Sequence, residues 1–272
     1  MAILSVDLAF RRWSDLGVVV LNRVRHQFPG AKGAVVACEI IPFPDPGLDP
    51  EIGRGPTHAE VDAEILAGRL NHLCAIRGIR VLMLDGPQAW KSRTNGLQHA
   101  RGCERQLNTV AKTGLPGVVK PVTYRTFAEF CMDVYDALCR RGWRRLETRD
   151  QPGQPAQRIL VESYPHAAWK SLGLKPLPAK RRARVSDLAE AYGALRAVVP
   201  FTTNRPPNHD QLQAIIGGLP GLDLEELNPA AVRIVGSPPR REEGHWREGF
   251  IVLPVAQRPP VRLRWLNSNQ VP

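Results

Sequence analysis

The sequence lacks any apolar run that is long enough to cross a membrane. Its longest apolar stretch, residues 16–21, has the length of a strand, whereas a bilayer needs roughly 18 consecutive apolar residues. The N-terminus also lacks the pattern of a secretory signal peptide, because Asp7 interrupts its apolar segment and the basic Arg11 and Arg12 follow that segment instead of preceding it. We therefore expect no membrane partner.

The sequence has no paired cysteine motif. It holds five cysteines, none of them in a C-x-x-C pair, and an odd number fits a disulfide framework poorly. Reduced thiols are typical of proteins that work in a reducing compartment. The cysteine usage therefore predicts a cytoplasmic protein.

Positive charge is what the sequence has in excess. Its 272 residues are 43% apolar and 23% charged, with 37 Lys and Arg against 26 Asp and Glu, a formal charge of +11. This composition is that of a globular protein that can bury a core without disulfides. The positive balance favours an anionic partner, with nucleic acid first; solubility alone is the other explanation.

The first part of the chain predicts a sheet. Three apolar, β-branched stretches, residues 3–9, 17–21 and 33–41, are separated by short connections, which favours antiparallel pairing. Helical spacing of apolar residues then predicts a helix over 57–76, with Thr57 as its N-cap, and residues 79–85 predict a fourth strand.

The rest of the chain alternates helices and strands. The patterns predict helices over 124–141, 183–199 and 208–219, and strands over 158–162 and 250–254. Residues 87–121 are polar and basic and contain glycines, and we expect them to form an inserted cap over a site, with a helix near residues 99–110. The element order predicts a single mixed-sheet α/β domain over residues 1–272, with the cap as an insertion within it.

Four carboxylates lie where such a sheet usually carries its chemistry. Asp7 is near the end of the first strand, Asp85 ends the fourth, Glu162 ends the fifth and Asp210 opens a late helix. If the strands are neighbours, three acids meet at one edge, where like charges repel unless a cation lies between them. Oxygen ligands without a cluster of His or Cys favour Mg²⁺ or Mn²⁺, and two such ions can promote phosphodiester cleavage.

Each of these acids, taken singly, also has a structural explanation. Asp7 could pair with a nearby arginine, Asp85 could be a turn residue before Gly-Pro, and Glu162 could be an ordinary charge at a sheet edge. Asn208 could be the N-cap of the late helix, with Asp210 as an acid in its first turn. The joint pattern on a basic chain favours the chemical interpretation.

Six short motifs together resemble domain-of-unknown-function family 429, described as predicted nucleases of the ribonuclease H-like fold. They span most of the chain: V-D-L-A through V-V-V-L (6–21), M-L-D-G-P (83–87), A-R-G-C-E-R-Q-L (100–107), V-E-S-Y-P-H-A-A-W (161–169), H-D-Q-L-Q-A (209–214) and E-G-F-I-V-L-P (248–254). The resemblance implies a ribonuclease H-like mixed sheet, with three antiparallel strands and then parallel strands, flanked by helices.

The same resemblance implies catalytic and metal-binding roles for four residues: Asp7, Asp85, Glu162 and Asp210. Such families tend to place small residues after the last aspartate, whereas this chain has Gln211 there. That departure leaves three roles open for Asp210: it binds metal directly, binds it through water, or only caps the helix.

Basic residues of two segments are candidates for binding substrate phosphates. They are Lys91, Arg93 and Arg101 in the cap, and Lys180, Arg181 and Arg182 before a helix. A solvated surface is the alternative for each, and Arg101 with Glu104 could form a plain ion pair on a helix. No phosphate-binding loop of the form G-x-x-x-x-G-K-[ST] is present, so we expect no nucleotide cofactor.

The sequence therefore predicts a metal-dependent nuclease that uses two Mg²⁺ or Mn²⁺ ions. Two alternatives remain open at this point. One is a non-catalytic nucleic-acid-binding or adaptor protein on the same fold, and the other is a metal-dependent hydrolase of small phosphorylated molecules.

Overall fold

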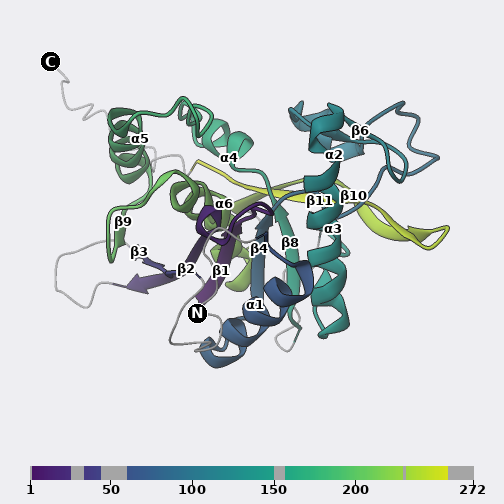
Figure 1. Ribbon diagram of the computed structural model, residues 1–272. Coiled ribbons are helices and arrows are strands. Elements are labelled where there is room, and N and C mark those ends of the chain that lie inside the picture. Colours follow the sequence, from purple (N-terminus) through teal and green to yellow (C-terminus); the bar gives the residue numbers. More distant parts are fainter. Residues whose placement is uncertain (1, 26–33, 44–59, 150–156, 229–230, 257–272) are drawn as a thin grey trace, which may run out of the picture.

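One large mixed sheet with helices on both faces dominates the molecule (Figure 1). The computed structural model describes residues 2–25, 34–43, 60–149, 157–228 and 231–256. The predicted α/β class with a mixed sheet is confirmed. In the described ranges, no helix is long and apolar enough to cross a membrane.

The middle of the sheet has the predicted strand directions. Its strands are β1 (Ala2–Asp7), β2 (Gly17–Arg25), β3 (Ala34–Ile40), β4 (Val81–Asp85) and β8 (Ile159–Ser163). β1, β2 and β3 pair antiparallel, β4 runs parallel to β1, and β8 runs parallel to β4. The carboxyl ends of β1, β4 and β8 therefore meet at one edge.

Short strands and a long hairpin extend this sheet beyond the prediction. The additional strands are β7 (Arg144–Arg145), β9 (Phe201–Thr203), β10 (Val232–Glu242) and β11 (His245–Pro254). The order is β10-β11-β8-β4-β1-β2-β3-β9, with β7 against β8. Only residues 250–254 of the hairpin were predicted as a strand, because two prolines and three arginines interrupt any apolar alternation in β10.

Helices cover the two faces of the sheet unequally. α1 (Ala63–Arg77) and α3 (Arg125–Arg140) pack over one face, and α6 (His209–Glu225) lies along the other with α4 (Pro165–Ser171) and α5 (Val185–Val198). Side chains of each strand alternate between these two cores. In β1, Ile3 packs with the α6 side and Leu4 with the α1 side.

The segment over residues 87–121 contains little regular structure. It holds α2 (Gly102–Leu107) and a two-stranded sheet of β5 (Lys112–Thr113) and β6 (Val119–Lys120). Two 3₁₀ turns, η1 (Trp13–Asp15) and η2 (Val122–Tyr124), complete the described elements. The helix predicted near residues 99–110 is thus confirmed as a shorter one.

Two helix boundaries differ from the prediction. α1 begins at Ala63 because the Asp62 side chain caps it, accepting from the Ile65 backbone N–H at 2.9 Å; the predicted cap, Thr57, lies outside the described residues. α6 continues six residues beyond the predicted end at 219, through Pro220 to Glu225. Its buried second half packs against the sheet, which outweighs the local effect of the proline.

α6 approaches the sheet very closely, and this fixes the position of its first turn. A Cβ atom added to Gly218 would lie 2.6 Å from the Ser5 Cβ, and one added to Gly17 would lie 2.3 Å from the Asp210 carbonyl oxygen. The Ser5 hydroxyl donates to the Ala214 carbonyl at 2.7 Å. The N-terminus of α6 is therefore held against the start of β2, beside the carboxyl end of β1.

Candidate active site

Asp7 and Asp85 form a pair at the carboxyl edge of the sheet. They are in-register neighbours on the parallel strands β1 and β4, and both are partly buried. Burial and the charge of Asp85 raise the pKa of Asp7 well above its usual range, and burial raises the pKa of Asp85 to about 7. Their carboxyl groups share a hydrogen bond, so near neutral pH the pair holds a proton that a cation can replace.

Asp210 brings a third carboxylate to the same face. It lies in the first turn of α6, close enough for its charge to raise the pKa of Asp7 further. Asn208 caps the helix by accepting from the Gln211 N–H at 2.9 Å, and the Gln211 side chain accepts from the Asn208 N–H at 2.9 Å. The residue that departs from the family pattern thus completes a capping box.

Lys180 supplies positive charge to this cluster. Its ammonium group donates to Asp210 and, at 2.8 Å, to Asp15. Burial opposes the charged form, but these hydrogen bonds and charges raise the pKa of Lys180 overall. The lysine therefore stays charged and partly neutralises the acids, and Asp210 does not present both oxygens freely.

Ser163 is the third member of the row that begins with Asp7 and Asp85. It is the in-register partner of Asp85 on β8. Its side chain is buried, and its hydroxyl has no hydrogen-bond partner among the described residues. Sequence reasoning missed this residue. The alternation of strand residues was the signal that could have found it, because Ser163, not Glu162, shares the face of Asp85.

Glu162 lies on the opposite face of the sheet. Its register partner on β4 is Leu84, which packs in the core beneath α1 and α3. Both oxygens of the carboxylate bind Arg101, each at 2.7 Å, and one also accepts from the Gln88 N–H at 3.0 Å. Glu162 is 3% exposed and Arg101 is 1% exposed. The structure therefore joins Glu162 to the 87–121 segment instead of to the Asp7–Asp85 pair.

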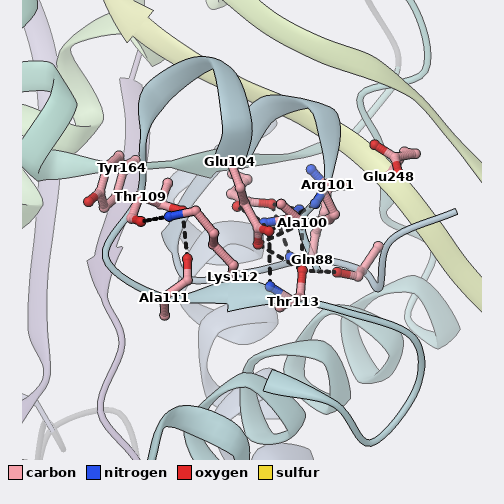
Figure 2. A network of polar contacts seen from close by, with 12 residues as sticks. Gln88, Ala100, Arg101, Glu104, Thr109, Ala111, Lys112, Thr113, Tyr164 and Glu248 are labelled. Atoms are coloured by element: carbon pink, nitrogen blue, oxygen red, sulfur yellow. Dashed lines mark hydrogen bonds and ion pairs between the residues drawn. The ribbon is translucent and has the colours of Figure 1, made fainter. Parts of the chain in front are cut away.

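Arg101 sits at the centre of a buried polar network (Figure 2). Its Nε donates to Glu104 at 3.0 Å, which confirms the predicted ion pair. Glu104 also accepts from the backbone N–H and the hydroxyl of Thr113, at 2.9 and 2.7 Å. A third buried acid, Glu248, accepts from the Gly102 N–H at 2.8 Å. These contacts fix α2 and β5 to the sheet.

The other predicted phosphate-binding residues have different surroundings. Lys91 is buried and donates to the Ser92 carbonyl at 2.8 Å. Arg93 is exposed and pairs with Glu243 at 3.0 Å. Arg181 and Arg182 are exposed beside Lys180. The structure thus places three of the six predicted basic residues together, in the segment that reaches Asp210.

A cavity of about 230 Å³ opens beside Asp85. It is bounded by the ends of β4 and β8, by the 87–121 segment, and by residues of α3 and α4. Its aromatic wall comprises Tyr124, Phe127, Tyr164 and His166. The site thus combines an acidic pair with a half-open aromatic cavity.

The donor set fits a hard cation at the Asp7–Asp85 pair. Within the described ranges, no three His, Cys, Asp or Glu side chains come together as a metal site. Two carboxylates in hydrogen-bond contact, with oxygen donors as neighbours, suit Mg²⁺ or Mn²⁺. The oxygens of Glu162 bind Arg101, so the structure does not bring all four acids together at the pair.

The comparisons with known proteins show a weak structural likeness and no match of family or curated sequence. No family model matches the chain, so membership of the resembling family stays a prediction. No curated protein matches it either. A solved structure of RuvC from Thermus thermophilus is similar with a TM-score of 0.37 and 11% identity, over 83% of this chain and 96% of that chain. Fold and site define an α/β protein with a partly buried acidic pair at the carboxyl edge of a mixed sheet.

Proposed function

We propose that the protein is a metal-dependent nuclease with a ribonuclease H-like fold, acting on phosphodiester bonds of nucleic acid. The observation that supports this most is the Asp7–Asp85 pair, two carboxyl groups held in contact by adjacent parallel strands. The sheet order β3-β2-β1-β4-β8, antiparallel and then parallel, supports the fold assignment.

Asp7 and Asp85 would hold a Mg²⁺ or Mn²⁺ ion in place of their shared proton. Such an ion supplies an activated water and polarises the scissile phosphate. The pair is partly open to solvent, so a cation and a phosphate group can reach it. Asp210, beside Asp7, is the candidate for orienting the attacking water or, after leaving Lys180, for binding a second ion.

Lys180, Arg181 and Arg182 would hold the nucleic-acid backbone next to the acids. Lys180 lies at the site, and the two arginines are exposed beside it. The net charge of +11 supports a polyanionic partner. Glu162 and Arg101 act as positioning residues in this proposal, since they fix the 87–121 segment, which serves as the cap, next to the acidic pair.

Two measurements on the whole chain test this proposal. Mn²⁺ titration calorimetry at low salt should show binding to the wild-type protein and its loss in Asp7→Asn. Labelled single- and double-stranded DNA and RNA should be cut only with Mg²⁺ or Mn²⁺, and not by that variant.

Asp133→Asn is the matched control, because it removes one carboxylate from the exposed side of α3. It should bind Mn²⁺ and cleave like the wild type. Full cleavage by a folded Asp7→Asn protein would refute the mechanism. Nucleic-acid binding without metal uptake or cleavage would favour the adaptor alternative instead.

A further inference from the structure

The cavity beside Asp85 has a lining that excludes a phosphate. Its charged lining groups are Asp85, Glu104, Glu162 and Arg101, three carboxylates against one guanidinium. That guanidinium already binds both glutamates. An anionic group that entered the cavity would meet net negative charge, and the described lining residues offer it no free cation. The cavity therefore favours an uncharged occupant.

The side chains that line the cavity favour an aromatic ring. Tyr124, Phe127, Tyr164 and His166 line it together with aliphatic side chains. The rings of Tyr164 and His166 are neighbours, with centroids 5.9 Å apart. Burial and the charge of Lys170 lower the pKa of His166, which keeps its imidazole neutral. Aromatic walls of this kind stack on any nucleobase.

Polar atoms of the cavity lining can bond the heteroatoms of such a ring. Ser163 lines the cavity, and its buried hydroxyl lacks a partner among the residues described. Tyr164, also a lining residue, accepts a weak hydrogen bond from the Val110 N–H at 3.4 Å and keeps its own O–H available. A hydrocarbon ring would leave these donors unsatisfied, whereas a base would not.

The volume limits the occupant to a single ring system. About 230 Å³ is below the roughly 300–1,000 Å³ of ordinary small-molecule sites. A base pair or a dinucleotide therefore does not fit, and one base must leave its stack to enter.

We propose that this cavity binds one unpaired nucleobase of the substrate, which places the phosphodiester attached to that nucleotide at the Asp7–Asp85 pair. The cleavage step rests on the proposed nuclease function, but base binding does not. The substrate class is then a single strand, or a structure with an unpaired nucleotide. A small phosphorylated molecule that lacks a base is disfavoured, because the cavity would not accept its phosphate.

The test uses the whole chain in EDTA, so that binding is measured without cleavage. The probe is a single-stranded DNA oligonucleotide with one 2-aminopurine, whose fluorescence falls when the base stacks on an aromatic ring. Binding should quench it. Tyr124→Ala should weaken binding roughly tenfold, whereas Val122→Ala, an exposed residue of the same turn outside the cavity, should not change it.

His166→Ala provides a second variant on a different element, and it should also reduce the quenching. Adenosine should compete with the probe, whereas inorganic phosphate at the same ionic strength should not. Unchanged fluorescence on binding, equal effects of Tyr124→Ala and Val122→Ala, or competition by phosphate as effective as by adenosine would each overturn base binding.

Cleavage assays separate this inference from the proposed function. With Mg²⁺ or Mn²⁺ added, an oligonucleotide with abasic sites should be cut at least tenfold more slowly than the intact strand. Equal cutting of both strands would refute the base-binding role and leave the nuclease standing. Quenching of the probe fluorescence without any cleavage would refute the nuclease function and leave the base-binding site standing.

Discussion

Replacing Asp85 by Asn should make the metal-free protein more stable while it removes the proposed metal ligand. In the folded state the carboxyl group of Asp85 lies against that of Asp7. Ionising both groups there is unfavourable because of burial and mutual repulsion. An asparagine keeps the size and hydrogen-bonding capacity of the side chain but has no charge to bury.

The magnitude follows from the pKa of Asp85. Burial raises it from 3.8 to about 7, and one pKa unit corresponds to about 1.4 kcal/mol, so the full difference is about 4 kcal/mol. Since the side chain is only partly buried, solvent screening reduces the expected gain to about 2 kcal/mol.

The sign depends on pH in a defined way. Because the folded-state pKa is raised, the folded protein binds the proton more tightly than the unfolded chain does. The contribution of Asp85 to wild-type stability therefore falls as pH rises from about 4 to about 7 and then levels off. The advantage of Asp85→Asn should be small at pH 4.5 and complete at pH 8.

Thermal denaturation in EDTA at pH 4.5 and pH 8 measures this difference. A gain of about 2 kcal/mol raises Tm by roughly 4–8 °C for a chain of this size. Asp15→Asn is a control of opposite sign. Although burial acts the other way, hydrogen bonds and charges from Lys180 and Arg12 lower the pKa of Asp15, so its ionised form adds stability that is lost as pH falls. That variant should lose stability at pH 8.

A variant Asp85→Asn that is less stable than the wild type at pH 8, or whose advantage does not change with pH, would refute the reasoning. Either result would mean that burial does not disfavour the charged form of Asp85 in the folded protein. The pair would then no longer indicate a place for a cation.

Three further predictions concern the surroundings of the pair. Arg101→Met leaves Glu162 buried without its partner and should lower the unfolding free energy in urea by about 3–5 kcal/mol. Lys180→Ala removes a positive charge beside the acids; it should tighten Mn²⁺ binding severalfold by calorimetry and weaken oligonucleotide binding in anisotropy measurements. Gly218→Ala forces α6 away from β1 and should lower the unfolding free energy in the same urea assay by about 1–3 kcal/mol. Gly193→Ala is the control, because an added Cβ on this exposed part of α5 meets nothing, and it should not lower the unfolding free energy.

The acidic pair was predictable because it depends on local information. Asp7 and Asp85 each end an apolar strand, and parallel neighbours bring such ends together. The face of Glu162 was harder to predict, because a strand alternates its side chains and a shift of one residue reverses the face. The sequence showed that β8 ends near residue 162. Only the pairing of Glu162 with Leu84 fixes the face of the sheet on which the Glu162 side chain lies.

Contacts between distant segments were beyond sequence reasoning. Lys180 was predicted to bind phosphate, and its hydrogen bonds to Asp15 and Asp210 depend on how the loop before α5 returns over the sheet. The aromatic cavity joins residues from α3, α4 and the cap, none of which carries a pattern that points to the others. Such sites follow from tertiary packing, which no local periodicity encodes.

The ion pair of Arg101 and Glu162 has a consequence for how related chains can change. The two residues are 61 positions apart and belong to separate motifs, 100–107 and 161–169. Replacing either residue alone would leave the other buried without a principal charged partner. We therefore expect the arginine and the glutamate to be inherited as a unit: chains that replace one should replace both, and a chain that keeps only the glutamate should have another cation at the same place.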